Sequence, residues 1–265
     1  MNLRRFAILR EMGLAPLWRL RTSARTGVAE ANVNISDLPP AEAPKLNDDD
    51  QQMYQHAPVG TLPTESFSVA ASAAPASRVA AMDWAALEEA IHACRACVLC
   101  EKRTQAVPGV GDRQARWMFV GEGPGAEEDR RGEPFVGQAG RLLDNMLAAL
   151  GLRRGEDVYI ANAVKCRPPH NRTPESAEIA ACAAFLDRQI ALVRPRLLIA
   201  LGRPAAQVLL GREVSIAGAR GKRFERGGVP VIVTYHPAYL LRNPLDKGKA
   251  WEDLCFARRL VAEAT

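Results

Sequence analysis

Short apolar runs alternate with stretches of helical periodicity over the C-terminal part of the chain. Four apolar runs have the length of strands: Trp117–Val120, Val158–Ala161, Leu197–Leu201 and Val229–Val233. Apolar residues at helical spacing predict one helix over residues 141–150 and another over residues 175–193. Strands that are apolar on both faces and alternate with helices are typical of a parallel sheet covered on both sides. The pattern therefore predicts a three-layer α/β/α domain with a largely parallel central sheet.

The first 80 residues have a different pattern. Four apolar residues recur at helical spacing among arginines: Leu3, Phe6, Leu9 and Met12. They predict a short basic amphipathic segment over residues 1–27, either a loosely held helix or a docking peptide for an unknown protein partner. Residues 28–80 are rich in Ala, Pro and Ser with little periodicity, so we expect a disordered linker there. Asp83 precedes an apolar helical turn as an N-cap would, and we expect the folded domain over residues 81–265.

Composition and charge favour a soluble protein with an anionic partner. Hydrophobic residues make up 48% of the chain and charged residues 25%, as in ordinary globular proteins. No apolar run approaches the roughly 18 residues of a membrane-spanning helix, and arginines interrupt the N-terminus where a secretory signal needs an apolar core. We therefore expect a cytoplasmic protein without membrane contact. Over residues 81–265, Lys and Arg outnumber Asp and Glu by 27 to 22, which suits nucleic acid but also a solvated basic surface.

The spacing of the cysteines indicates a metal or iron–sulfur site. The chain has three cysteines two residues apart and two more downstream: Cys94, Cys97, Cys100, Cys166 and Cys182. In a cytoplasmic protein this spacing favours thiolate ligands over disulfides. Four thiolates suit either zinc or a [4Fe–4S] cluster, and the spacing alone does not separate the two. Unligated core cysteines are the alternative, which is reasonable for Cys255 near the C-terminus and for Cys100.

A glycine-rich, acidic turn follows the first predicted strand. Its sequence is Gly-Glu-Gly-Pro-Gly-Ala-Glu-Glu-Asp over residues 121–129. A dinucleotide-binding turn is disfavoured, because Ala126 replaces the third glycine, Pro124 lacks an amide donor and the acids would repel a pyrophosphate. A carboxylate on such a turn suits close approach to a neutral base or sugar, with the acid placed for catalysis. A tight strand–helix turn with solvated acids is the alternative.

Three further segments carry residue types suited to a nucleobase. Phe135, between proline and glycine in a predicted loop, suits either the core or a base-stacking position. Asn162 at the end of the second predicted strand suits either a cap or the reading of a base edge. The segment from His236 to Pro244 is predicted to be a loop that displays two leucines and an arginine. Exposed leucines beside a cation suit a wedge inserted into DNA, and a hydrophobic cap on the following helix is the alternative.

Together these segments resemble the family 4 uracil-DNA glycosylases, iron–sulfur enzymes of the uracil-DNA glycosylase superfamily. The resemblance covers residues 94–260 and rests on six ordered motifs: Cys94-x2-Cys97-x-Leu99, Gly121-Glu122-Gly123-Pro124-Gly125, Pro134-Phe135-Val136-Gly137-x-Ala139-Gly140, Asn162-Ala163-Val164-Lys165-Cys166-Arg167-Pro168-Pro169, Leu201-Gly202 and His236-Pro237-Ala238-Tyr239-Leu240-Leu241-Arg242-Asn243-Pro244. It implies that residues 81–265 form a catalytic domain that hydrolyses the N-glycosidic bond of uracil in DNA and leaves an abasic site.

The resemblance also implies a cofactor and a uracil pocket. A [4Fe–4S] cluster would be held by Cys94, Cys97, Cys166 and Cys182. Phe135 would stack on the flipped uracil, and Asn162 would recognise its Watson–Crick edge. The backbone around Gly121 and Gly123 would close the pocket. Cys100 lies beside the first motif, so it is open whether Cys100 replaces Cys94 or Cys97 as a ligand.

The chemical roles implied by the resemblance fall on two acids and a histidine. Glu122 would handle the water or the oxocarbenium charge, with Glu128 as a supporting carboxylate. His236 would hydrogen-bond the uracil carbonyl as negative charge develops on the leaving base. Three residues after it would fill the gap left by base flipping: Leu240, Leu241 and Arg242. The cluster would serve structure rather than redox chemistry, because hydrolysis moves no electrons.

Two alternatives to a hydrolase remain. One relative in the superfamily traps uracil-DNA covalently through a histidine in a basic insertion after the asparagine motif. His170 is present here but lacks that basic context, so hydrolytic turnover is favoured. The other alternative is a catalytically silent iron–sulfur DNA-binding module, against which the presence of both Glu122 and His236 argues. We expect the protein to act as a monomer.

Overall fold

The computed structural model describes residues 76–263. The amphipathic segment predicted over residues 1–27 lies outside these residues, as does the predicted linker except for its last five residues. Those five form helix α2 (Ala76–Ala80), which buries Val79. Helix α2 therefore lies just before the expected start of the domain at residue 81.

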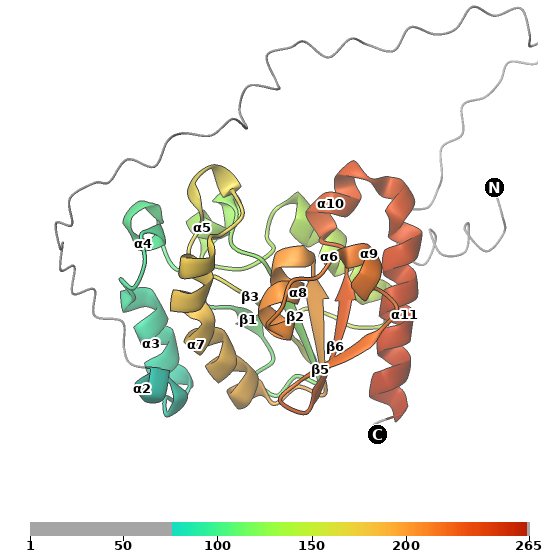
Figure 1. Ribbon diagram of the computed structural model, residues 1–265, viewed down its shortest axis with the longest axis horizontal. Helices are drawn as coiled ribbons and strands as arrows, with labels where there is room; N and C mark the ends of the chain where they lie inside the picture. Colours follow the sequence, from blue (N-terminus) through green and yellow to red (C-terminus); the bar gives the residue numbers. More distant parts are fainter. Residues whose placement is uncertain (1–75, 264–265) are drawn as a thin grey trace, which may run out of the picture. The chain divides into compact units, whose positions relative to one another are not determined.

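A six-stranded sheet with strand order β1-β3-β2-β4-β6-β5 forms the middle layer (Figure 1). The strands are β1 (Val110–Gly111), β2 (Trp117–Gly121), β3 (Val158–Asn162), β4 (Leu197–Leu201), β5 (Arg223–Arg226) and β6 (Val229–Thr234). The four inner strands are parallel, and β1 and β5 pair antiparallel at the two edges. This arrangement confirms the predicted three-layer architecture with a largely parallel sheet.

Successive residues of a strand point to opposite faces of the sheet. Since the inner strands are apolar on both faces, helices cover both. Trp117 and Phe119 face a core formed with α6 (Gln138–Ala149), α10 (Pro237–Arg242) and α11 (Lys247–Glu263). Met118 and Val120 face the other core, formed with α7 (Ser176–Val193), α8 (Arg203–Leu210) and α9 (Ile216–Ala219). Every residue of β2, β3 and β4 is buried, as the apolar runs predict.

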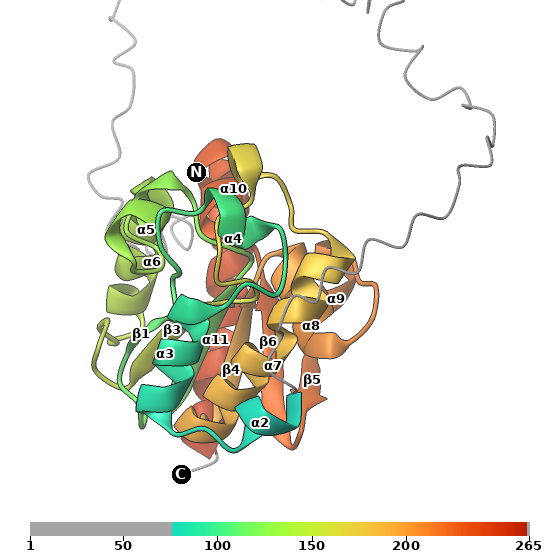
Figure 2. The same ribbon diagram turned by 90° about the vertical axis from the view of Figure 1, so that its left-hand side faces the viewer.

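A third apolar cluster lies on the outer side of α7. Helices α2, α3 (Trp84–Ala93) and α4 (Leu99–Lys102) lie beside α7, and Figure 2 views the domain from their side. The Asp83 carboxylate accepts a hydrogen bond from the Ala86 amide at 2.9 Å, which confirms the predicted N-cap of α3. This cluster also contains buried cysteines, so its packing bears on the candidate cofactor site.

Three elements differ from the sequence-based predictions. The segment after His236 is the short helix α10 rather than a loop, with Pro237 in its first turn, where the missing amide costs nothing. The edge strands β1 and β5 were not predicted. Within residues 76–263, no helix has the length and apolar character needed to cross a lipid bilayer.

Candidate active site

The carboxyl ends of the four parallel strands meet at one edge of the sheet, where parallel α/β proteins bind ligands. Gly121 at the end of β2 pairs in register with Asn162 at the end of β3. Glu122 follows β2 directly, and His236 follows β6 by two residues. A cavity of about 470 Å³ opens at this edge and is lined by Glu122, Gly123, Glu128, Phe135, Asn162, His236 and Arg242, among others. Its volume lies in the range of small-molecule sites, about 300–1,000 Å³.

Gly121 allows two pocket side chains to approach the backbone closely. A Cβ atom at this position would lie 2.4 Å from Asn162 Oδ1 and 2.6 Å from Phe135 Cζ. Both distances are too short for any side chain larger than hydrogen. Gly123 is similarly confined, since a Cβ atom there would lie 2.8 Å from the Val164 side chain. The glycines of the turn are therefore required by packing around the cavity.

Asn162 carries a buried polar atom without a partner in the described part of the chain. Its side chain is 2% exposed, and Oδ1 has no hydrogen bond to any residue from 76 to 263. Buried polar atoms are rarely left unsatisfied because the loss of hydration costs about 1–3 kcal/mol. Since Asn162 lines the cavity, a ligand with a donor group would satisfy this oxygen.

Phe135 packs into the core and also lines the cavity, so the core position is confirmed, and stacking on a base stays a prediction. Its ring centroid lies 5.4 Å from that of His236, with 31° between the ring planes. The residue adopts a φ of 56°, which is uncommon for a residue other than glycine. A strained aromatic residue at the wall of a cavity is typical of a functional position.

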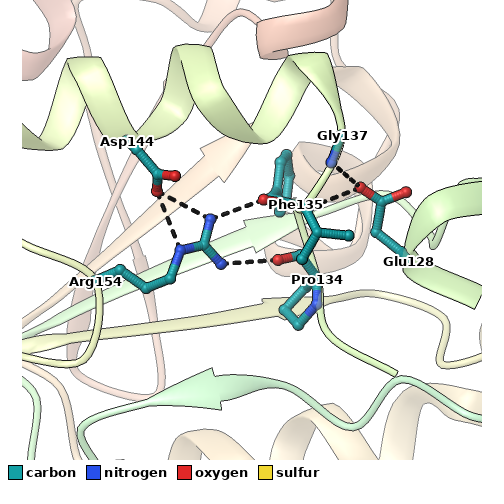
Figure 3. A network of polar contacts seen from close by, with 7 residues as sticks. Glu128, Pro134, Phe135, Gly137, Asp144 and Arg154 are labelled. Carbon is teal, nitrogen blue, oxygen red and sulfur yellow. Dashed lines mark hydrogen bonds and ion pairs between the residues drawn. The ribbon is translucent and has the colours of Figure 1, made fainter. Parts of the chain in front are cut away.

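Glu128, in helix α5 (Ala126–Arg131), binds the loop that carries Phe135. One carboxylate oxygen accepts hydrogen bonds from the amides of Val136 and Gly137 at 2.9 and 3.1 Å (Figure 3). The other oxygen accepts from the Gly125 amide at 3.1 Å. With both oxygens engaged by backbone donors, Glu128 fixes the Phe135 loop against the glycine-rich turn. Its geometry suits a structural role at the pocket better than proton transfer.

His236 caps helix α10 with one ring nitrogen. Nδ1 accepts a hydrogen bond from the Ala238 amide at 3.1 Å, so the proton of the neutral ring lies on Nε2. Burial lowers the pKa of His236 to about 4, and the positive charge of Arg242 contributes in the same direction. The imidazole is therefore neutral at pH 7 and offers Nε2–H as a donor at the cavity.

Glu122 is half-buried at the cavity wall. Burial raises its pKa above the usual value, while a hydrogen bond with the Thr173 side chain and the charge of Arg203 oppose that rise. A partly desolvated carboxylate is a stronger base than one in water, and its charge acts over a longer range. Glu122 therefore suits the activation of water or the stabilisation of a nearby positive charge.

The two leucines of helix α10 have different environments. Leu240 is fully buried in the core that α6, α10 and α11 form with one face of the sheet. The expectation that it fills the gap left by a flipped base is therefore wrong for this residue. Leu241 is 43% exposed, and Leu245 in the following turn is 88% exposed. Arg242 is exposed and lines the cavity. An apolar wedge next to a cation is thus available from Leu241 but not from Leu240.

The four matched cysteines lie in one region beside α7. Cys166 and Cys182 are buried in the third apolar cluster, and Cys94 and Cys97 pack against it. Burial raises the pKa of Cys182 to about 12. Within residues 76–263, no three His, Cys, Asp or Glu side chains converge as the ligands of one metal ion would.

Backbone and arginine donors surround these sulfur atoms. The Arg103 guanidinium donates to Cys166 Sγ at 2.9 Å, and the Lys165 amide donates to Cys182 Sγ at 3.4 Å. The Ala96 amide lies 3.5 Å from Cys94 Sγ. Donors of this kind stabilise thiolates, so the environment of the sulfurs suits a thiolate-ligated group.

Several contributors to the site were not identified from the sequence. The Lys165 ammonium is buried and donates to the Asn162 carbonyl oxygen at 2.8 Å, which fixes the backbone of the candidate base-reading residue. Gly202 has a φ of +90°, and a Cβ atom there would lie 3.0 Å from His236 Cβ. Thr173 lines the cavity beside Glu122. For Gly202, the Leu-Gly motif at the end of β4 was the signal in the sequence that could have identified this close approach to His236.

Comparisons with known proteins identify relatives of this chain. The family model of the uracil DNA glycosylase superfamily matches residues 108–255. The chain is 51% identical to a type-4 uracil-DNA glycosylase of Thermotoga maritima over 159 residues, which cover 59% of this chain and 82% of that protein. It is 49% identical to a type-4 uracil-DNA glycosylase of Archaeoglobus fulgidus over 162 residues, covering 58% and 81%. A type-5 uracil-DNA glycosylase of Pyrobaculum aerophilum is 38% identical over 157 residues, covering 52% and 67%. The chain belongs to the uracil-DNA glycosylase superfamily.

Proposed function

We propose that this protein hydrolyses the N-glycosidic bond of uracil in DNA and leaves an abasic site. The observation that carries the proposal is the buried Asn162 Oδ1, which has no hydrogen-bond partner among residues 76–263, at the wall of a cavity of about 470 Å³. The names of the relatives, type-4 uracil-DNA glycosylases, support the same substrate.

The Asn162 amide matches the edge of uracil. Uracil presents an N3–H donor next to the O4 acceptor, so Oδ1 accepts from N3 while the amide nitrogen donates to O4. Cytosine has an acceptor at N3 and an amino group at position 4, which would oppose both groups of the amide. Phe135 supplies an aromatic surface for the base, and the close approach at Gly121 holds that ring beside Asn162.

Cleavage develops negative charge on the uracil and positive charge on the sugar. The neutral His236 donates from Nε2 to the uracil carbonyl as this negative charge grows, without first needing a proton from solvent. Glu122 faces the developing positive charge or takes a proton from the attacking water. Both groups stabilise charges that exist only in the transition state, so they raise the rate more than the affinity.

The substrate base must leave the duplex before it enters the cavity. Flipping costs a few kcal/mol, and side chains inserted into the stack offset part of that cost. Leu241 is the exposed apolar residue closest in sequence to the His236 cap, and Arg242 beside it offers a charge to the phosphates. The excess of basic residues over 81–265 supports sequence-independent DNA binding.

We further propose that Cys94, Cys97, Cys166 and Cys182 hold a [4Fe–4S] cluster. Four cysteine thiolates suit such a cluster, and the resemblance to the family 4 enzymes favours iron over zinc. The cluster would supply a structural link between the start of the domain and α7. Anaerobically purified protein should contain about four irons per chain and absorb near ~400 nm; stoichiometric zinc without iron would contradict this assignment.

Incubation with an oligonucleotide that contains one uracil, followed by alkali, separates the possible activities. Strand cleavage after alkali indicates a glycosylase, because abasic sites are alkali-labile. Retention without cleavage would indicate a binding module, and an alkali-stable adduct would indicate covalent trapping. A cytoplasmic location, a monomeric state and a protein partner for the N-terminal segment stay predictions.

A further inference from the structure

The loop that carries Phe135 is held in an unusual backbone conformation. Phe135 has a φ of 56°, in the left-handed region that residues other than glycine rarely adopt. Its carbonyl oxygen lies so close to α6 that a Cβ atom on Gly140 would be 1.7 Å away. Such a conformation persists only when surrounding contacts hold it.

Arg154 makes contacts that hold this conformation from one side (Figure 3). It lies in the connection between α6 and β3, about twenty residues after the loop. Nη1 donates to the Pro134 carbonyl oxygen and Nη2 to the Phe135 carbonyl oxygen, both at 2.8 Å. Nε and Nη2 also donate to one oxygen of Asp144 in α6, at 3.1 and 3.0 Å. One guanidinium therefore links two successive carbonyls of the loop to the helix that follows it.

Glu128 holds the next two residues of the loop through their amides. The carbonyl oxygens of Pro134 and Phe135 thus bind the cation of Arg154, and the amides that follow Phe135 bind the anion of Glu128. The two charged groups come from different elements, and together they fix the peptide planes on both sides of Phe135.

We propose that Arg154 is a positioning residue, which holds the Phe135 ring in the place where it stacks on the flipped base. This inference rests on the proposed function. The ring lies within van der Waals distance of Gly121 and 5.4 Å from the His236 ring. A shift of the loop would therefore change the space that the cavity leaves for the base. It would also change the distance from the base to the Nε2–H donor of His236. Misplacement of this kind costs rate even though Arg154 touches no reacting atom.

The number and direction of the donors distinguish this role from a simple ion pair. The Asp144 carboxylate is 47% exposed, so its attraction to Arg154 alone contributes little. Lysine would keep the charge, but a single ammonium group lacks the planar fork that reaches two carbonyls and a carboxylate at once. A role in attracting DNA phosphate would need only the charge.

The neighbouring Arg153 provides a matched control. Its side chain is 73% exposed and pairs with Glu156 on the surface. Arg153→Ala removes the same charge from the same connection, but it leaves the Phe135 loop intact. Any general effect of charge on DNA affinity should therefore appear equally in Arg153→Ala and Arg154→Ala.

The test is the single-turnover rate of uracil release from a uracil-containing duplex, measured for wild type, Arg153→Ala, Arg154→Ala and Arg154→Lys. We expect both Arg154 variants to lose on the order of 10- to 100-fold in rate, with wild-type affinity for uracil-free DNA and with Arg153→Ala close to wild type. Each rate is then measured again with Phe135→Leu, which keeps apolar volume but removes the aromatic surface. Because Arg154 acts through the ring, Arg154→Lys should cause much less further loss in that background.

Each other result overturns the inference. A wild-type rate for Arg154→Lys would mean that only the charge matters, and an equal loss with and without Phe135→Leu would mean a general structural role. Thermal unfolding identifies a variant that does not fold, and Arg154→Lys carries the test if Arg154→Ala is unfolded. If wild type releases uracil normally and Arg153→Ala and Arg154→Ala have equal rates, this inference is refuted and the proposed function is not. Absence of release by wild type would refute the proposed function and this inference with it.

Discussion

The substitution His236→Asn separates the two roles that the structure gives to His236. Nδ1 accepts the hydrogen bond from the Ala238 amide that starts α10. Asparagine is a favourable N-cap whose side-chain oxygen also accepts from the first turn. His236→Asn should therefore preserve the start of the helix, whereas the Nε2–H donor of the ring is lost. His236→Ala removes both the cap and the donor.

The expected loss of rate follows from the charge on the leaving base. A donor aimed at a developing anion in a water-poor site contributes about 10²–10³ in rate. His236 provides this donor in the neutral form, since burial lowers its pKa to about 4. We therefore expect His236→Asn to reduce the single-turnover rate by about 10² or more at pH 7, while affinity for duplex DNA changes little because phosphate contacts are unaffected.

The lowered pKa of His236 also predicts how stability depends on pH. An unfolded chain protonates this histidine near pH 6.5, but the folded protein does so only near pH 4. Between these values the unfolded state binds more protons, so stability falls as the pH falls. Each pKa unit is worth about 1.4 kcal/mol, which makes the loss at most about 3 kcal/mol at this partly cavity-facing site. The variant His236→Asn should lack this contribution and lose less stability between pH 6.5 and pH 4.

Two measurements check these expectations on the same preparations. Single-turnover kinetics give the rate of uracil release, and urea unfolding at several pH values gives the free energy of unfolding. A wild-type rate for His236→Asn would remove histidine from the mechanism and leave Glu122 to act alone. An identical pH dependence of stability in wild type and His236→Asn would show that the imidazole is not held neutral by burial.

Three further predictions follow from the site. Burial raises the pKa of Glu122, so the wild-type cleavage rate should fall as the pH drops through that raised pKa, and Glu122→Gln should lack this acidic limb in a pH–rate profile. Cys182→Ala should lose iron in a metal analysis, whereas Cys255→Ala should retain it; equal iron in the two variants would contradict the ligand assignment. Gly121→Ala places a Cβ atom 2.4 Å from Asn162 Oδ1, so cleavage should fall at least ~10-fold in a single-turnover assay, and an unchanged rate would show that the pocket adapts.

The sequence predicted the inner sheet because its strands are apolar along most of their length. Apolar runs of this length, separated by helical stretches, are typical of strands covered on both faces in a parallel sheet. The edge strands carry no such pattern: β1 has two residues, and in β5 the exposed Arg223 and Glu225 alternate with the half-buried Phe224 and Arg226. The helix α10 is only six residues long, too short for a clear apolar periodicity, and Pro237 in its first turn is compatible with a helix.

The candidate site was predictable where its residues follow strands. Glu122, Asn162 and His236 each lie at or shortly after the end of a strand of a parallel sheet, and the carboxyl ends of such strands meet. Arg154 has no comparable signal, because its partners are backbone carbonyls that any sequence would provide. Adjacent leucines at 240 and 241 were equivalent in the sequence, and only the packing of α10 on the sheet separates the buried one from the exposed one.

The paired measurement of rate and affinity for Asn162→Ala tests most directly whether this pocket reads uracil. The Asn162 Oδ1 atom is buried without a partner in the described residues, so its hydrogen bond forms only when the base occupies the cavity. We predict that Asn162→Ala, measured with one uracil-containing duplex, loses on the order of 10² or more in single-turnover release of uracil. Binding of the matching uracil-free duplex should be unchanged within about twofold, since phosphates dominate it. A rate of release equal to wild type, or equal losses of rate and of binding to uracil-free DNA, would contradict the assignment of this pocket to uracil.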